Sequence, residues 1–262
     1  MSKSKPLLSS TLGKKLIMSL TGIFLCLFLV VHLIGNLQLF KDDAGYAFNT
    51  YAHFMTNFTP IKIVSILLYL TFVLHAVYAL VITRKNKAAR PIGYNQSSGN
   101  ANSKWNSRNM GVLGTIILIF LVTHMQNFWW KYHNDQVPYV QYEKNLDTQE
   151  VTSQALSSDE FTNYLVTYKT AENGDAIEVI KSQDLYQQVE YAFENIGLVL
   201  LYVIAMAALS FHLIHGFQSA FQTLGFKHRR YIGTIRFLGI WVFGVIIPIA
   251  FAAIPVYIYL VR

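Results

Sequence analysis

The chain has 262 residues, of which 53% are hydrophobic and only 13% are charged, and its formal net charge is +7. Soluble domains usually contain about 25% charged residues, so this composition excludes an ordinary soluble domain and favours a membrane protein. The single cysteine, Cys26, excludes an intrachain disulfide and a cluster of thiolate metal ligands. Any iron–sulfur cluster would therefore have to belong to another subunit.

The apolar residues gather in five long runs along the chain. Runs of about 18 or more apolar residues predict spanning helices, because a segment in lipid must satisfy its own backbone hydrogen bonds. In chain order, the predicted helices cover about 16–38, 61–83, 110–130, 194–222 and 234–260. The first run is too long for the core of a cleaved signal peptide, so we expect it to be retained. The sequence predicts an all-α membrane protein in which residues 1–262 form a single five-helix membrane domain.

Basic residues mark alternate connections between these helices. Residues 1–15 carry four Lys and no acid, and residues 84–108 carry six Lys or Arg and no acid. The short link between the last two helices contains Lys227, Arg229 and Arg230. Because basic connections face the cytoplasm, the N-terminus is expected to be cytoplasmic and the C-terminus to face out. The positive charge thus indicates orientation in the membrane, and no nucleic-acid partner is expected.

The connections on the predicted outer side differ from the basic ones. Residues 36–60 are rich in aromatic side chains and are expected to lie at the membrane interface. Residues 131–193 form a polar, acidic insertion between the third and fourth helices, in which alternation around Phe161, Tyr164, Val166 and Tyr168 suggests short strands. On the inner side, the polar stretch 90–108 predicts a flexible cytoplasmic loop.

Histidines occur inside four of the five predicted helices. The helical residues are His32, His75, His124, His212 and His215, whereas His53, His133 and His228 fall in connections. Ionisable side chains within a membrane are costly and usually functional. The alternative for each histidine is an interhelical hydrogen bond, worth about 1 kcal/mol. One histidine on each of four helices favours a shared function, and neutral imidazoles are suitable axial ligands for haem iron.

The depth of each histidine sorts the four into two pairs. His32 and His124 lie roughly 25 Å and 21 Å from the inner ends of their helices, at about 1.5 Å per residue. His75 and His212 lie roughly 14 Å and 18 Å from the inner ends of theirs. The sequence thus predicts an outer pair, His32 with His124, and an inner pair, His75 with His212, each able to hold one haem. With two imidazole ligands a haem has no open position, so it transfers electrons and does not bind oxygen.

The fourth helix offers two histidines for the inner pair. His215 matches the depth of His75 slightly better, whereas His212 is followed one turn later by Gly216, which would let a flat macrocycle approach the backbone. We therefore expect His212 to be the ligand and keep His215 as its alternative. Ordinary helix packing also explains small residues such as Gly216.

The histidines and their neighbours resemble those of a known family, the cytochrome b membrane-anchor subunits of succinate:quinone oxidoreductases. The residues that carry the resemblance are Thr21-Gly22 followed after nine residues by His32, then His212-x-x-x-Gly216, and Leu224-Gly225, where relatives have an aromatic–Gly pair. Five helices in one polypeptide with four histidines resemble the dihaem type, which includes succinate dehydrogenases and quinol:fumarate reductases. The resemblance covers nearly all of the helical chain.

This resemblance implies an electron-transfer function in a bacterial cytoplasmic membrane. Two haems b would be held by His32/His124 and His75/His212 and would carry electrons between an iron–sulfur subunit and a membrane quinone, such as menaquinone. A flavoprotein subunit with FAD and the iron–sulfur subunit would dock on the cytoplasmic face, so the chain would not act on succinate alone. Two features depart from the family: the insertion 131–193 is long, and Ser210 stands where dihaem fumarate reductases carry a glutamate.

Two other functions also fit the apolar helices and their histidines. One is a haem b anchor for another respiratory enzyme, such as a hydrogenase. The other is a transporter or structural membrane protein whose histidines make hydrogen bonds and hold no haem.

Overall fold

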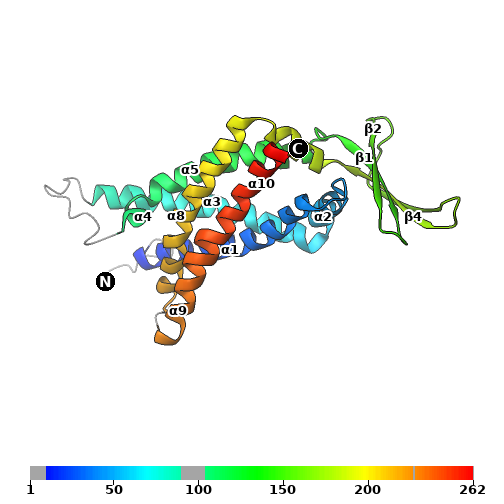
Figure 1. Cartoon of the computed structure of the whole chain (residues 1–262). Helices are drawn as coiled ribbons and strands as arrows, with labels where there is room; N and C mark the ends of the chain where they lie inside the picture. Colours follow the sequence, from blue (N-terminus) through cyan, green and yellow to red (C-terminus); the bar gives the residue numbers. More distant parts are fainter. Residues whose placement is uncertain (1–9, 90–103, 227, 262) are drawn as a thin grey trace. The chain divides into compact units, whose positions relative to one another are not determined.

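The computed structural model describes residues 10–89, 104–226 and 228–261, and Figure 1 shows the course of the chain. Within these residues, five helical spans are long and apolar enough to cross a membrane. They are Thr11–Phe40, Thr59–Ala88, Met110–His133, Ile196–Thr223 and Arg229–Val261. The predicted helices are therefore confirmed in number and order, and the chain is a multi-pass membrane protein. The basic residues Lys3, Lys5, Arg90 and Lys227 lie outside the described part. So do residues 90–103 of the predicted loop 90–108, whereas Trp105–Arg108 of that loop form a short helix.

Three of the five spans change their helix type along their length. The 3-10 segment η2 continues α1, and π-helical segments interrupt the third and fifth spans. In chain order the elements of the spans are α1 (Thr11–Asn36), η2 (Leu37–Phe40), α3 (Thr59–Ala88), α5 (Met110–His124), η3 (Met125–Trp130), α6 (Lys131–His133), α8 (Ile196–Thr223), α9 (Arg229–Phe237), η4 (Leu238–Ile246) and α10 (Ile247–Val261). A further short helix, α4 (Trp105–Arg108), precedes α5. π-helical segments are rare and often occur at functional sites.

The contacts divide the chain into two units. The first comprises Met1–Val31, Ile63–Phe120 and Tyr202–Ala252, and the second comprises His32–Lys62, Leu121–Leu201 and Ala253–Arg262. The boundaries between the units fall inside the spanning helices, so each unit contains parts of several helices. The first contains His75 and His212, and the second contains His32, His124 and the insertion.

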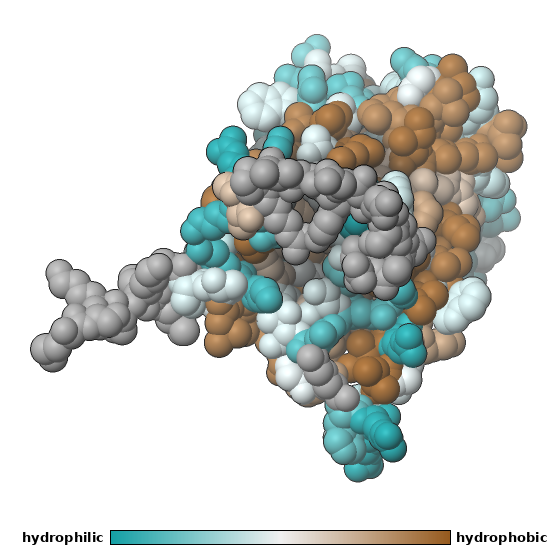
Figure 2. Space-filling view, turned by 90° about the vertical axis from the view of Figure 1, so that its left-hand side faces the viewer, coloured by the Kyte–Doolittle hydropathy of each residue, from teal (hydrophilic) through white to brown (hydrophobic). Residues whose placement is uncertain are grey.

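Large apolar side chains are exposed along the spans. On α3, Ile63, Ile66 and Val73 are 58%, 59% and 61% exposed. Hydrophobic residues also lie open at the surface in the space-filling view of Figure 2. A soluble monomer rarely exposes so much contiguous apolar surface, whereas lipid tails solvate it well.

The insertion forms a small antiparallel sheet of four strands. The strands are β1 (Tyr139–Asn145), β2 (Val151–Leu156), β3 (Leu165–Thr170) and β4 (Ala176–Gln183), in the order β2-β1-β4-β3. Val140, Tyr142 and Ile180 form its buried cluster. The expected strand structure is thus present: Val166 and Tyr168 lie in β3, while Phe161 and Tyr164 precede it.

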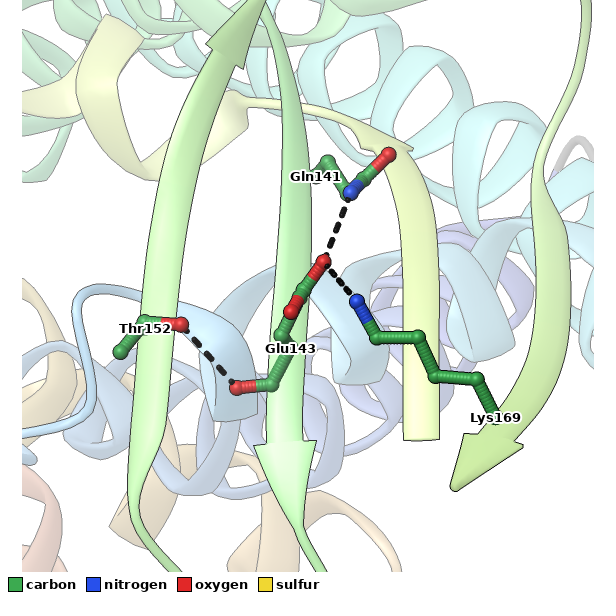
Figure 3. Close-up of polar contacts among 4 residues, drawn as sticks. All are labelled: Gln141, Glu143, Thr152 and Lys169. Atoms are coloured by element: carbon green, nitrogen blue, oxygen red, sulfur yellow. Dashed lines mark hydrogen bonds and ion pairs between the residues drawn. The ribbon is translucent and has the colours of Figure 1, made fainter. Parts of the chain in front are cut away.

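One face of the sheet carries a polar cluster (Figure 3). Glu143 accepts hydrogen bonds from Lys169 Nζ at 2.7 Å and from Gln141 Nε2 at 3.1 Å, while its backbone carbonyl accepts one from Thr152. The side chain of Lys169 is 50% exposed, so this ion pair contributes little to stability. The cluster therefore forms a solvated face of the sheet.

Two helices outside the spans hold the sheet in its unit. They are α2 (Tyr46–Asn57), which lies within the predicted interfacial segment 36–60, and α7 (Leu185–Phe193). Asn49 is 1% exposed and donates through Nδ2 to the Tyr142 hydroxyl and to Asp184, each at 2.8 Å. Asp184 in turn caps the N-terminus of α7. Because unpaired buried polar groups are costly, this saturated network fixes the insertion against α2.

Candidate functional site

The structure brings the predicted inner pair together. His75 on α3 and His212 on α8 lie in the same unit, with ring centroids 6.4 Å apart and an angle of 60° between the ring planes. Both side chains are partly buried. The two histidines are 137 positions apart in the sequence, so their proximity depends on how α3 packs against α8.

His75 is held by the first span. Thr21 on α1 lies with its Oγ1 2.9 Å from His75 Nδ1. The next residue, Gly22, faces the same ring: a Cβ at that position would lie 3.6 Å from His75 Cε1. Both residues of the Thr21-Gly22 motif therefore contact the inner pair, in addition to sharing a helix with His32.

His212 has a different environment from His75. Its Nδ1 is buried and has no hydrogen-bond partner. Gly114 on α5 faces the ring, because a Cβ there would lie 3.8 Å from His212 Cε1. Buried polar atoms are usually hydrogen-bonded, so the unpaired Nδ1 distinguishes His212 from His75.

His215 is not brought into the inner pair. His215 is partly buried on α8, whereas the histidine whose ring lies 6.4 Å from that of His75 is His212. A Cβ at Gly216 would meet Met110 at 3.9 Å and His212 at 4.0 Å, which are ordinary contacts. The geometry therefore favours His212 over His215 as the partner of His75.

The predicted outer pair is also assembled, in the second unit. The rings of His32 and His124 have centroids 5.7 Å apart and are perpendicular, at 90°. His124 is the last residue of α5 and immediately precedes the π-helical segment η3. One turn further along, Phe128 packs its ring edge-on against His124 at 5.4 Å. The change from α-helix to π-helix thus begins directly after His124, a candidate haem ligand.

The spacing of both pairs fits two imidazoles on opposite sides of one metal ion. An imidazole nitrogen lies about 2 Å from a first-row metal such as zinc, so two coaxial rings would have centroids about 6 Å apart. The observed separations are 6.4 Å and 5.7 Å. Four histidines from four different spans could therefore hold two haems. Among the described residues, no group of three His, Cys, Asp or Glu side chains suits a bare metal ion.

The remaining histidines make contacts with neighbouring residues of their own units. His53 stacks on Tyr164 with centroids 3.5 Å apart, and its pKa is lowered by partial burial and then by the charge of Lys62. His133 stacks on Trp129, and His228 caps α9 by accepting from the Arg230 amide. His133, which was predicted to fall in a connection, lies in α6 at the end of the third span.

Ser210 makes a contact that the sequence did not indicate. Its hydroxyl donates to the backbone carbonyl of Gly244 in η4. A Cβ at Gly244 would overlap Ile214, so α8 and η4 approach each other closely here. Ser210 therefore joins two spans at the position where the resembling fumarate reductases carry a glutamate.

A shallow cavity of about 370 Å³, open to the surface, lies in the unit that contains His32. Its lining residues are Gln38, Lys41, Tyr46, Ala47, Thr50, Tyr51 and Phe54. The Tyr51 ring also packs on Gly35, three residues after His32, where a Cβ would overlap it. Neither this cavity nor the contact of Thr21 with His75 was predicted. For Thr21 the sequence gives only a depth, roughly 9 Å from the inner end against roughly 14 Å for His75 at about 1.5 Å per residue, and not the rotation that turns it towards α3.

A comparison of the chain with models of known families, with curated proteins and with solved structures found no match. The function therefore has to be inferred from the residues and contacts described above, together with the resemblance in the histidine-bearing motifs.

Proposed function

We propose that this chain is the dihaem cytochrome b subunit that anchors a succinate:quinone oxidoreductase in the membrane. The observation that carries the proposal is the assembly of two histidine pairs from four spans, with ring separations of 6.4 Å and 5.7 Å. A protein using histidines only for helix packing has no need to bring them together in pairs. Glycines stand beside both rings of the inner pair, Gly22 beside His75 and Gly114 beside His212, so the helix backbones pack close to the imidazoles.

Each histidine would have a defined role in this function. His75 and His212 would hold one haem b, and His32 and His124 would hold the other. When bound, haem supplies a site that gains and loses one electron at iron. Each haem would be held by two histidines of this chain, so its iron would be closed to oxygen and would serve in electron transfer. Apolar surroundings exclude water from the rings.

The proposed partners follow from the charge of the predicted connections. The basic N-terminus, the 84–108 connection and the 227–230 link would face the cytoplasm of a bacterium. A flavoprotein subunit and an iron–sulfur subunit would dock there, and electrons would pass between succinate or fumarate and membrane quinone. Cys26 is buried and is the chain's only cysteine, so the iron–sulfur clusters would belong to the partner.

The cavity beside α2 is the best candidate for the quinone head group. It is a shallow hollow that opens to the surface, so a head group could enter it without any movement of the chain. Lys41, Gln38 and Tyr51 offer donors for quinone carbonyl oxygens, and Phe54 offers an aromatic wall. Partial burial raises the pKa of Tyr51, so its phenol stays protonated and able to donate.

Purification of the complex from its membrane tests this function. We expect a reduced-minus-oxidised spectrum with a b-type signal of about two haems per chain, and copurification of a flavin-containing subunit. A haem-free protein would contradict the proposal and favour a transporter or structural protein. Haem without a succinate-oxidising partner would instead favour an anchor for another respiratory enzyme, such as a hydrogenase.

A further inference from the structure

Thr21 occupies an unusual position on α1, because its hydroxyl serves two elements at once. The residue is buried, at 9% exposure. Its Oγ1 lies 2.7 Å from the Ile17 carbonyl and 3.2 Å from the Met18 carbonyl, one turn earlier on the same helix. The same oxygen lies 2.9 Å from His75 Nδ1 on α3.

The number of hydrogens decides the direction of each bond. A threonine hydroxyl has one proton to donate and two lone pairs to accept with. The Ile17 and Met18 carbonyls can only accept, so the hydroxyl proton is used within α1. With its proton used within α1, the hydroxyl oxygen is left to accept from His75, and in that arrangement His75 Nδ1 carries the proton. In a neutral imidazole, a proton on Nδ1 leaves the lone pair on Nε2.

We propose that Thr21 is a positioning residue that fixes the His75 imidazole in the tautomer with its proton on Nδ1, so that Nε2 is presented to haem iron. This inference rests on the proposed function. Gly22 contributes to the same positioning, because without a side chain it lets the α1 backbone lie against the His75 ring. A Cβ at Gly22 would lie 3.6 Å from His75 Cε1. The ring is thus held at its Nδ1 edge by one residue and at Cε1 by the next.

The inner pair is asymmetric, because His75 has a hydrogen-bond partner at Nδ1 and His212 has none. His212 Nδ1 is buried without a hydrogen-bond partner. A hydrogen bond from the non-ligating nitrogen orients an imidazole ligand and increases its basicity. A more basic ligand stabilises the oxidised metal, so Thr21 lowers the midpoint potential of the haem held by His75. His212 has no corresponding hydrogen bond at Nδ1, so its basicity as a ligand is not increased in this way.

Replacement of Thr21 in the assembled complex tests this role. In Thr21→Val, which keeps the shape and removes the hydroxyl, we expect one of the two haem steps in a redox titration to move to higher potential. The low-spin EPR signal of that haem should also change, since it reports the orientation of the imidazole planes. The other haem should keep its potential and its signal. Thr21→Ser, which restores the hydroxyl, should return both readouts towards those of the unmodified complex.

Thr115→Val is the matched control. Thr115 also donates to the carbonyl one turn earlier, that of Gly111, at 2.8 Å, but it is exposed on α5. It should leave both haem steps unchanged. A Thr21→Val complex with two haems and unaltered potentials and EPR signals would overturn the inference while leaving the proposed function intact. Loss of one haem in Thr21→Val but not in Thr21→Ser would support it. Equal loss in both variants would show a packing role and overturn it.

Discussion

At the scale of single residues, Tyr51 connects two features of its unit. Its ring packs on Gly35, and the same side chain lines the 370 Å³ cavity. Tyr51→Phe keeps the ring and removes only the donor. We therefore predict that this variant retains both haems and their spectra but reduces quinone at least several-fold more slowly, as measured with soluble quinone analogues. A fall in haem content instead would mean that the hydroxyl stabilises the unit and that the cavity is not the quinone site.

The residues of the candidate site differ in how far the sequence could predict them. The pairing of His32 with His124 and of His75 with His212 follows from depth along the helices, because a fixed rise per residue converts position into height. Thr21 contacts a histidine 54 positions away, and its rotation towards α3 is set by interhelical packing. No local pattern encodes that rotation, so the contact required the structure.

At the scale of elements, the close approach of α8 and η4 depends on Gly244. A Cβ there would overlap Ile214, and Ser210 donates to the Gly244 carbonyl. We predict that Gly244→Ala lowers the free energy of unfolding by about 1–3 kcal/mol, the usual penalty of overpacking. Thermal unfolding of the purified complex measures it. Gly233→Ala is the control, because no atom lies within 4 Å of a Cβ at that position. Equal stability in the two variants would show that the two spans adjust freely.

The spanning elements were predicted more successfully than the others. A run of apolar residues marks the part of a helix in lipid, so the predicted range 16–38 lies inside the observed Thr11–Phe40. The helix extends further because its polar ends lie beyond the apolar run. Helix α2 has no apolar run and was predicted only as an interfacial connection. The π-helical segments η3 and η4 were not predicted, because their sequences are typical of any apolar helix.

At the scale of the whole molecule, each unit carries one histidine pair and its own support. The first unit adds Thr21 and Gly22 to His75 and His212, and the second adds the insertion, held to α2 through Asn49. The number of spans and the presence of the polar insertion followed from composition alone. The sheet order β2-β1-β4-β3 did not, because pairing between β1 and β4 bridges strands that are not consecutive.

The central claim is that the four histidines act as two specific pairs, and haem analysis of single His→Ala variants tests it most directly. We predict that His75→Ala and His212→Ala each remove the same one of two b-type components in a redox titration, while His32→Ala and His124→Ala each remove the other. His215→Ala, the matched control on α8, should retain both. Retention of both haems in His212→Ala, or loss of the same component from His75→Ala and His32→Ala, would contradict this account.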